Sequence, residues 1–218
     1  MIAAFPRPAL TRHSQRGNTG RRYHDHMKEH SDPTCSTSTS VQTDYPTLLT
    51  LGHSTRSAEE LISLLRDNKV DLLADVRTVP RSRHNPQFNY DTLPHTLQAA
   101  GIEYRHCKDL GGLRKARRDS INDAWRNASF RGYADYMQTP EFETALATLL
   151  ALTAQHRVAI MCAEAVPWRC HRSLIADVVT ARGGRVEHII GNKTQPHQLT
   201  RFAVVDNGHV TYPYTPQS

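Results

Sequence analysis

The chain has 218 residues, 38% of them hydrophobic and 22% charged, which suits one α/β domain and leaves too little for two full domains. Its formal net charge of +6 favours anionic partners, because Lys and Arg side chains bind phosphates. The sequence has no run of about 18 apolar residues, so we expect a cytoplasmic protein without a membrane span. Four cysteines are too few for a disulfide framework, and we expect reduced thiols.

Residues 1–45 are rich in Ser, Thr, Arg and His and contain no periodic apolar stretch that could bury surface. We therefore expect a disordered basic tail, followed by one α/β domain over residues 46–218.

Hydrophobic periodicity predicts that strands and helices alternate through this domain. Strands are predicted in TLLTL, DLLADVR, IEYRH, VAIMC and RVEHII. Helices are predicted in AEELISLLRDN after a capping box at Ser57 and Glu60, at residues 93–100, after Thr139 and Pro140, and in HRSLIADVVTAR. The alternation predicts a mainly parallel sheet of about five strands with helices on both faces. FAVVDNGHVTY predicts a C-terminal hairpin, which we expect at the edge of the sheet.

Polar residues follow the predicted strands. His53 and Ser54 follow the first, Asp75 and Arg77 close the second, and Cys162 and Glu164 follow the fourth. Because the carboxyl ends of parallel strands meet at one edge, we expect these side chains to form one pocket. Asp75 and Arg77 flank one residue of a strand and should pair, either to position substrate or as a structural ion pair.

Two segments combine cations with aromatic residues, a pattern that favours nucleic acid but also fits a solvated basic loop. The first is TVPRSRHNPQFNY, and the second extends over residues 109–137. Because the second is long and has no clear strand, we expect a lid over the strand ends. The substrate contacts expected from both segments are Arg81, Ser82, Arg83, Phe88, Trp125, Arg126, Arg131 and Tyr133.

The segment CAEAVPWRCHR carries the residues with the most reactive chemistry. One interpretation makes Cys162 a nucleophile, Glu164 an acid–base group and His171 a proton shuttle, with Asp75 completing the catalytic set. Cys170 and Arg172 would then contact the substrate. A second interpretation is zinc binding by Cys162, Cys170 and His171. A third is structural, with small thiols packed beneath a loop.

Four stretches, TLGHSTRSAEELISLL, LLADVRTVPRSRHNPQFN, WRNASFRGYADYM and VAIMCAEAVPWRCHRSLIA, resemble the domain of unknown function 488 family over residues 47–190. The resemblance implies a fold more than a reaction. The Asp75 to Arg77 stretch is also similar to the first half of a rhodanese domain. The second half departs from that pattern, because six residues separate Cys162 from Arg169 where rhodanese loops have five.

We therefore expect a hydrolase or transferase that acts on a phosphate-bearing substrate, above all a nucleic acid or nucleotide, with base or nucleoside chemistry as one option. No resident cofactor is expected, and zinc is the alternative. The rival functions are a non-catalytic nucleic-acid-binding protein with a structural or zinc-bound cysteine segment, and a sulfur-handling, rhodanese-like protein.

Overall fold

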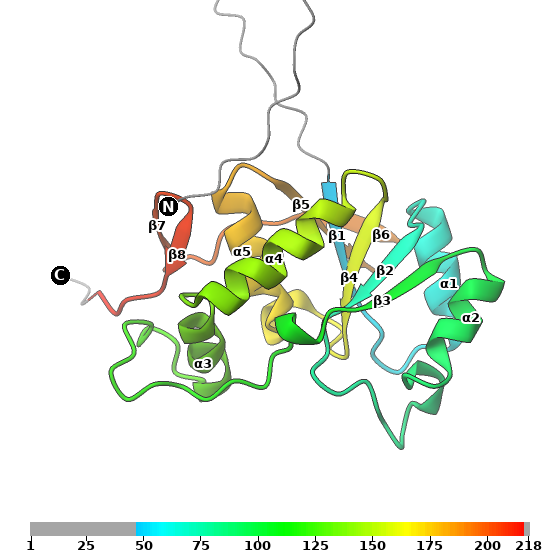
Figure 1. Ribbon diagram of the computed structural model, residues 1–218, viewed down its shortest axis with the longest axis horizontal. Coiled ribbons are helices and arrows are strands. Elements are labelled where there is room, and N and C mark those ends of the chain that lie inside the picture. Colours follow the sequence, from blue (N-terminus) through cyan, green and yellow to red (C-terminus); the bar gives the residue numbers. More distant parts are fainter. Residues whose placement is uncertain (1–46, 216–218) are drawn as a thin grey trace, which may run out of the picture. The chain divides into compact units, whose positions relative to one another are not determined.

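A computed structural model describes residues 47–215, and in it a six-stranded sheet lies between two groups of helices (Figure 1). The strand order is β3-β2-β4-β1-β5-β6, and all neighbours are parallel except β5 and β6. This arrangement confirms the predicted mainly parallel α/β fold. The predicted tail at residues 1–45 lies outside the described residues.

The elements alternate in chain order as the periodicity predicts. The strands of the large sheet are β1 (Thr47–Gly52), β2 (Leu72–Asp75), β3 (Glu103–His106), β4 (Val158–Cys162), β5 (Arg185–Ile190) and β6 (Lys193–Pro196), and β7 (Val204–Asp206) pairs with β8 (His209–Thr211). The helices are α1 (Ala58–Asp67), α2 (Leu93–Ala99), α3 (Ala128–Tyr136), α4 (Pro140–Leu152) and α5 (Arg172–Ala181), with short 3₁₀ turns η1 (Pro86–Phe88), η2 (Lys108–Leu110) and η3 (Pro167–Arg169). The described helices include none that is long and apolar enough to cross a membrane.

Two separate cores cover the two faces of the sheet. On one face, Leu49, Leu51 and Met161 pack with α1 and α2, and on the other, Leu48 and Ile160 pack with α3, α4 and α5. The division follows from strand geometry, because successive side chains project to opposite faces. The same alternation decides which residues share a site at the strand ends.

Local capping signals fix where the helices begin. The Ser57 hydroxyl accepts a hydrogen bond from the Glu60 amide at 3.2 Å, and the Ser57 amide donates to the Glu60 carboxylate at 2.7 Å. At α4, the Thr139 hydroxyl accepts from the Phe142 amide at 3.3 Å, with Pro140 at the first helical position. Both predicted helix starts are confirmed, because these side chains satisfy amides that the helix leaves unpaired.

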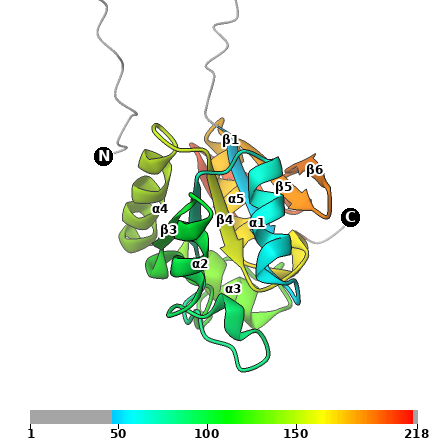
Figure 2. The ribbon, with the colours of Figure 1, turned by 90° about the vertical axis from the view of Figure 1, so that its right-hand side faces the viewer.

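The predicted hairpin forms as β7 and β8, but its expected place at the sheet edge is wrong. The turn uses Asn207 and Gly208, whose φ angles are 48° and 78°. Val210 and Tyr212 are buried in the α3–α5 core, so the hairpin packs on helices instead of joining the sheet. The edge is taken by β6, which is exposed along its whole length and carries no apolar pattern that would have predicted it (Figure 2).

The long segment before α3 does not form the predicted lid over the cleft described below. The Asp135 carboxylate of α3 accepts hydrogen bonds from the Arg117 amide at 2.8 Å and from the Asn122 side chain at 2.9 Å. The Asn122 side chain in turn accepts from the Tyr212 amide at 2.9 Å. These bonds hold the later part of the segment against α3 and the C-terminal hairpin. The earlier part contacts the chain after β2, where the Leu113 amide donates to the Thr78 hydroxyl at 3.2 Å, but no residue of the segment is among those that line the cleft.

Candidate functional site

A cleft of about 330 Å³ lies at the carboxyl ends of β1, β2 and β4. It is lined by His53, Ser54, Thr55, Arg77, Val79, Arg81, Ser82, Asn85, Ala163, Glu164 and Ala165. Ligands of open α/β sheets bind at this edge. Among the described lining residues, Glu164 is the one carboxylate beside Arg77 and Arg81. Because Asp75 neutralises Arg77 from beneath, Arg81 and Glu164 are the unpaired charges of the cleft within residues 47–215.

Arg77 is held in the cleft by a dense set of hydrogen bonds. Its Nε donates to the Asp75 carboxylate at 2.9 Å, and Nη2 donates to the same carboxylate and, at 2.8 Å, to the Phe88 carbonyl. Nη1 donates to His53 Nε2 at 3.2 Å. Asp75 is fully buried and also accepts from the Tyr104 hydroxyl at 2.8 Å. The predicted pairing of Asp75 with Arg77 is confirmed.

These bonds leave one donor for a ligand. A guanidinium has five N–H groups, and one on Nη1 of Arg77 has no acceptor among the described residues. His53 Nδ1 donates to the Ser54 carbonyl at 2.9 Å, and His53 Nε2 accepts from Arg77. Burial lowers the pKa of His53 to about 4, so the ring is neutral at pH 7. His53 therefore orients Arg77 and does not exchange protons itself.

The loop after β2 supplies Arg81 and Ser82 to the cleft, as predicted. The Ser82 amide donates to the Asn89 side chain at 2.6 Å, and the Ser82 hydroxyl accepts from the Asn85 amide at 3.1 Å. The loop is thus ordered by its own polar side chains, while the Arg81 side chain is exposed. Arg83 is also exposed but is not one of the described residues that line the cleft.

Phe88 does not stack on substrate, which corrects the prediction. Its side chain is fully buried, and its ring centroid lies 4.3 Å from that of His53. An aromatic residue that lies between polar residues in a sequence can equally be buried and pack against their side chains. Phe88 does so twice, by packing on His53 and by accepting a hydrogen bond from Arg77 through its carbonyl.

The Glu164 segment is fixed to the end of β1. The Ser54 amide donates to the Ala163 carbonyl at 2.9 Å, and Ser54 has a φ of 51°, which is rare for a residue other than glycine. A Cβ at Gly52 would overlap the Glu164 carbonyl oxygen. The absence of a side chain at Gly52 therefore allows the backbone of Glu164 to approach β1, which places the Glu164 carboxylate in the cleft.

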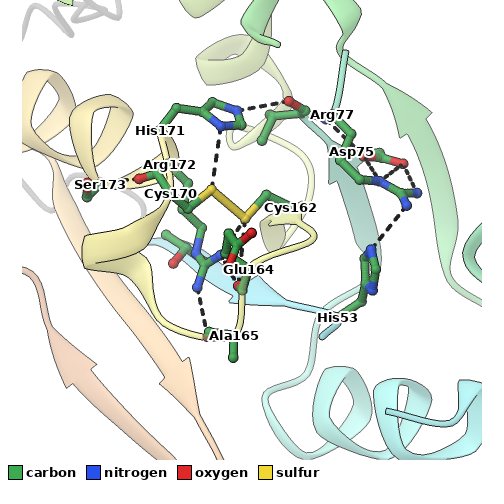
Figure 3. Close-up of a disulfide and its surroundings, with 12 residues drawn as sticks. His53, Asp75, Arg77, Cys162, Glu164, Ala165, Cys170, His171, Arg172 and Ser173 are labelled. Atoms are coloured by element: carbon green, nitrogen blue, oxygen red, sulfur yellow. Dashed lines mark hydrogen bonds and ion pairs between the residues drawn. A yellow bond between two sulfur atoms is a disulfide. The ribbon is translucent and has the colours of Figure 1, made fainter. Parts of the chain in front are cut away.

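The sulfur atoms of Cys162 and Cys170 face each other and are drawn as a disulfide in Figure 3, with the Cα atoms 7.4 Å apart. The sequence did not predict that these two thiols would meet. The reason is the short turn η3, which returns the chain so that Cys170 faces the end of β4. The two cysteines are eight residues apart in an irregular loop, and this spacing does not show that the loop brings them together. The exposed fractions of Cys162 and Cys170 are 2% and 5%.

The cysteine pair does not share the cleft, contrary to the predicted single pocket. Cys162 belongs to the core on the α3–α5 face, whereas Asp75 alternates onto the opposite face with Leu73. Figure 3 shows the disulfide and the Arg77–His53 pair as separate groups. Of the predicted site, the cleft contains His53, Ser54, Arg77, Arg81, Ser82 and Glu164.

His171 and Arg172 each contact one member of the cysteine pair. His171 Nε2 donates to the Val76 carbonyl at 2.9 Å, which leaves Nδ1 facing the Cys170 sulfur at 3.5 Å. Burial lowers the pKa of His171 to about 4. Arg172 Nη1 donates to the Cys162 sulfur. The predicted role of His171 as a shuttle for substrate in the cleft has no geometric support, since its ring faces the sulfur pair.

Arg172 is fully buried and does not reach the cleft, although it was expected to bind substrate. Its guanidinium donates to the carbonyls of Glu164 at 2.6 Å and Ala165 at 3.0 Å. Burial lowers its pKa to about 10. Arg172 thus holds the backbone that carries Glu164, while its Nε has no hydrogen-bond acceptor among residues 47–215.

The second basic and aromatic segment lies outside the cleft lining, and the burial of Tyr133 corrects one more expected substrate contact. Tyr133 is fully buried and its hydroxyl donates to the Leu110 carbonyl at 3.0 Å. The Trp125 ring stacks on Phe130, with centroids 4.7 Å apart. Arg126 and Arg131 flank this aromatic group, outside the described cleft lining. Composition alone could not separate a packed aromatic cluster from a base-stacking surface.

A sequence model of the family described as "Domain of unknown function DUF488" matches residues 57–179. The chain belongs to this family. The DUF488 match begins at the N-cap of α1 and ends in α5, so it contains Asp75, Arg77, Glu164 and both cysteines of the pair. No curated protein and no solved structure matches the chain. The family resemblance of the four quoted stretches is confirmed.

The sequence did not predict Tyr104, which supports the DUF488 site from behind Asp75, or the exposed Trp168 near it in the chain. Tyr104 hydrogen-bonds Asp75 from β3, and the pairing of β2 with β3 places it beside that carboxylate. Trp168 is 63% exposed and lies on the segment that carries Glu164. The strand alternation gives a signal for Tyr104, but an irregular loop gives none for Trp168.

Metal binding has no assembled ligand set in the part of the chain that the structure describes. Within residues 47–215, no group of three or more His, Cys, Asp and Glu side chains is arranged around a common point. Zinc binding by Cys162, Cys170 and His171 stays a prediction.

Proposed function

We propose that the cleft binds a phosphate group of a nucleotide or nucleic acid and that Glu164 is the acid–base group for its hydrolysis or transfer. The observation that carries this proposal is the position of one carboxylate opposite Arg77 and Arg81 in a cleft at the strand ends. A volume of about 330 Å³ is in the range of small-molecule sites.

Phosphate binding is supported by donors that are already oriented. Asp75 and His53 fix the guanidinium of Arg77, so its remaining N–H group can meet an oxyanion without losing side-chain freedom. The Ser82 hydroxyl accepts from two backbone amides, which leaves its own proton free to donate. Arg81 adds positive charge without a carboxylate partner among the described residues.

Glu164 fits an acid–base role because its backbone is fixed and its side chain is accessible. The bonds from Arg172 and the close approach to Gly52 hold its main chain. Its carboxylate accepts no hydrogen bond from the residues that the structure describes, so it can take a proton from a bound nucleophile or give one to a leaving group. Cys162 is no longer the proposed nucleophile, because its sulfur lies on the opposite face of the sheet.

Two exposed aromatic rings lie outside the cleft lining but on the loops that carry Arg81 and Glu164, and they support a nucleotide over a smaller phosphate ester. Tyr90 is 59% exposed on the loop that carries Arg81, and Trp168 is 63% exposed on the loop that carries Glu164. Aromatic faces that are open to solvent can stack on bases, and the exposed Arg83 adds charge for neighbouring phosphates.

Binding is tested by comparing Arg81→Ala with Arg117→Ala, using AMP and a short single-stranded oligonucleotide as probes in calorimetry. Arg117 is an exposed arginine that pairs with Asp119 outside the cleft, so it is a matched control. Loss of one charge-assisted contact should weaken binding by about tenfold in Arg81→Ala. Equal affinity of Arg81→Ala and the unmodified protein would contradict the proposed phosphate site.

Turnover is tested separately with Glu164→Gln, which keeps the shape of the side chain. Nucleoside phosphates and oligonucleotides are incubated with the protein, and products are resolved by chromatography. We expect Glu164→Gln to bind the probes normally and to lose about 100-fold or more in rate. Probe binding without any product from the unmodified protein would instead favour the non-catalytic, nucleic-acid-binding function.

A further inference from the structure

The two sulfur atoms of the cysteine pair have chemically different neighbours. Cys162 faces the cationic Nη1 of Arg172, whereas Cys170 lies 3.5 Å from the neutral ring nitrogen Nδ1 of His171 (Figure 3). A cation stabilises a thiolate, and a neutral imidazole nitrogen accepts a hydrogen bond from a thiol. A disulfide with only a structural role requires neither group.

In the oxidised state, Arg172 has no carboxylate at ion-pair distance among residues 47–215, and the Glu164 carboxylate acts on it only from farther away. Its hydrogen-bond acceptors are the Cys162 sulfur and the carbonyls of Glu164 and Ala165, and none of these carries a charge while the disulfide is formed. Burying a cation without a counterion costs free energy, which a thiolate would offset. The fully buried guanidinium is therefore suited to the reduced state, in which Cys162 is the missing anion.

His171 is arranged to accept a hydrogen bond from the Cys170 thiol. Its Nε2–H is fixed by the Val76 carbonyl, so the lone pair on Nδ1 points to the sulfur. Cys170 also lies directly before α5, a ten-residue helix whose N-terminal dipole favours a negative charge. The geometry thus orients the Cys170 thiol and stabilises negative charge at both sulfurs.

We propose that Cys162 and Cys170 are a redox-active dithiol–disulfide pair that exchanges with low-molecular-weight thiols and disulfides. During oxidation, Cys170 loses its proton to solvent, and the thiolate attacks one sulfur of a small disulfide RSSR. A mixed disulfide forms and RS⁻ leaves. The Cys162 thiolate then attacks the Cys170 sulfur and displaces the second RS⁻.

The exchange is balanced without a further reagent. One protein dithiol and one RSSR give one protein disulfide and two RSH, and the two cysteine protons pass to the two departing thiolates. Reduction follows the same steps in reverse, with a small dithiol or two thiols as the reductant. The inference does not depend on the proposed function of the cleft, because it is measured without substrate.

Access to the sulfurs is controlled by the short segment 163–169. Both sulfurs are buried, but Ala163, Glu164, Ala165, Trp168 and Arg169, which lie between them in sequence, are exposed. We expect a local displacement of this segment, which would break the bonds from Arg172 to the Glu164 and Ala165 carbonyls, to admit a small thiol. Cys170 is the expected first point of attack, because Arg172 then stabilises the Cys162 thiolate that leaves.

The exchange is tested on the full chain with Cys35→Ser and Cys107→Ser, which leaves only the proposed pair. The protein is equilibrated over ratios of reduced to oxidised dithiothreitol, quenched with acid and labelled with a maleimide of high mass. We expect a reversible change from no label to two labels per chain, with little singly labelled protein and an unchanged circular dichroism spectrum. Two labels at every ratio, or a disulfide that is reduced only after unfolding, would overturn the proposal.

The effect of Arg172 on Cys162 is tested with the Cys170→Ser form of the same background. The alkylation of Cys162 by iodoacetamide is measured as a function of pH. We expect the midpoint for Cys162 to fall at least one pH unit below that of an ordinary thiol, about 8.5. Arg172→Gln should raise it, while Arg169→Gln, at the exposed neighbouring arginine, should not. If Arg172→Gln does not fold, the midpoint for Cys162 in the protein with Arg172 still tests the proposal. A midpoint at or above that of an ordinary thiol would overturn it.

Discussion

Acidification should destabilise the fold strongly, because three buried histidines are neutral in it. One of them, His188 on β5, accepts from the Thr50 hydroxyl at 2.7 Å and donates to His197 at 2.9 Å. His197 donates to the buried Asp177 carboxylate at 2.8 Å, which also accepts from the Tyr212 hydroxyl. In this chain of hydrogen bonds, the imidazole rings of His188 and His197 each carry one proton. A second proton on His188 would therefore place a positive charge in the protein interior.

The sign and size of the effect follow from the pKa values of His53, His171 and His188. Burial lowers each from 6.5 to about 4, so the unfolded chain binds more protons than the folded one between these values. Stability is therefore complete above pH 6.5 and is lost as the pH falls toward 4. By pH 5 each histidine should have removed about 2 kcal/mol, or about 6 kcal/mol together, a large part of a typical total.

Urea denaturation followed by circular dichroism at pH 7.5, 6.5, 5.5 and 5 measures this loss. His188→Asn should reduce the difference between pH 7.5 and pH 5 by about a third, while His84→Asn, at an exposed histidine, should leave it unchanged. A free energy of unfolding that stays constant from pH 7.5 to pH 5 would refute the reasoning.

Three further predictions concern the site itself. Asp75→Asn should lower the free energy of unfolding by about 3 kcal/mol in urea denaturation, because it leaves Arg77 buried without a counterion. The control is Asp119→Asn at an exposed ion pair, and an equally small loss in both variants would contradict this prediction. Gly52→Ala should weaken AMP binding and lower the melting temperature, since the new Cβ would displace the Glu164 backbone; normal values for both would show that the close approach is unimportant. Reduction of the disulfide should speed amide hydrogen exchange in residues 163–169 relative to α4, and identical exchange in both states would argue against an effect on this segment.

The sequence predicted the features that depend on local chemistry and on strand polarity. The capping box of Ser57 and Glu60 requires only neighbours in sequence, and the parallel order of the sheet follows from alternating strands and helices. The pairing of Asp75 with Arg77 could be predicted because residues two apart in an extended chain project to one face. The same reasoning placed the functional residues at one edge of the sheet.

Features that depend on which face a residue takes could not be predicted in the same way. Cys162 and Asp75 both end strands, but whether they project to the same face depends on how two neighbouring strands align. The register pairs Asp75 with Met161, which places the Cys162 side chain on the other face. Phe88 and Tyr133 illustrate a second limit, because an aromatic residue among cations has the same sequence signature whether it is buried or exposed.

We propose that substrate chemistry belongs to the Glu164 cleft and not to the cysteine pair. The most direct test uses a nucleoside phosphate or oligonucleotide that the unmodified protein converts, and compares the rate of product formation for Glu164→Gln and for the double variant Cys162→Ser/Cys170→Ser. The cleft account predicts that Glu164→Gln loses turnover while the double cysteine variant retains it. Full activity of Glu164→Gln together with an inactive double cysteine variant would contradict the account.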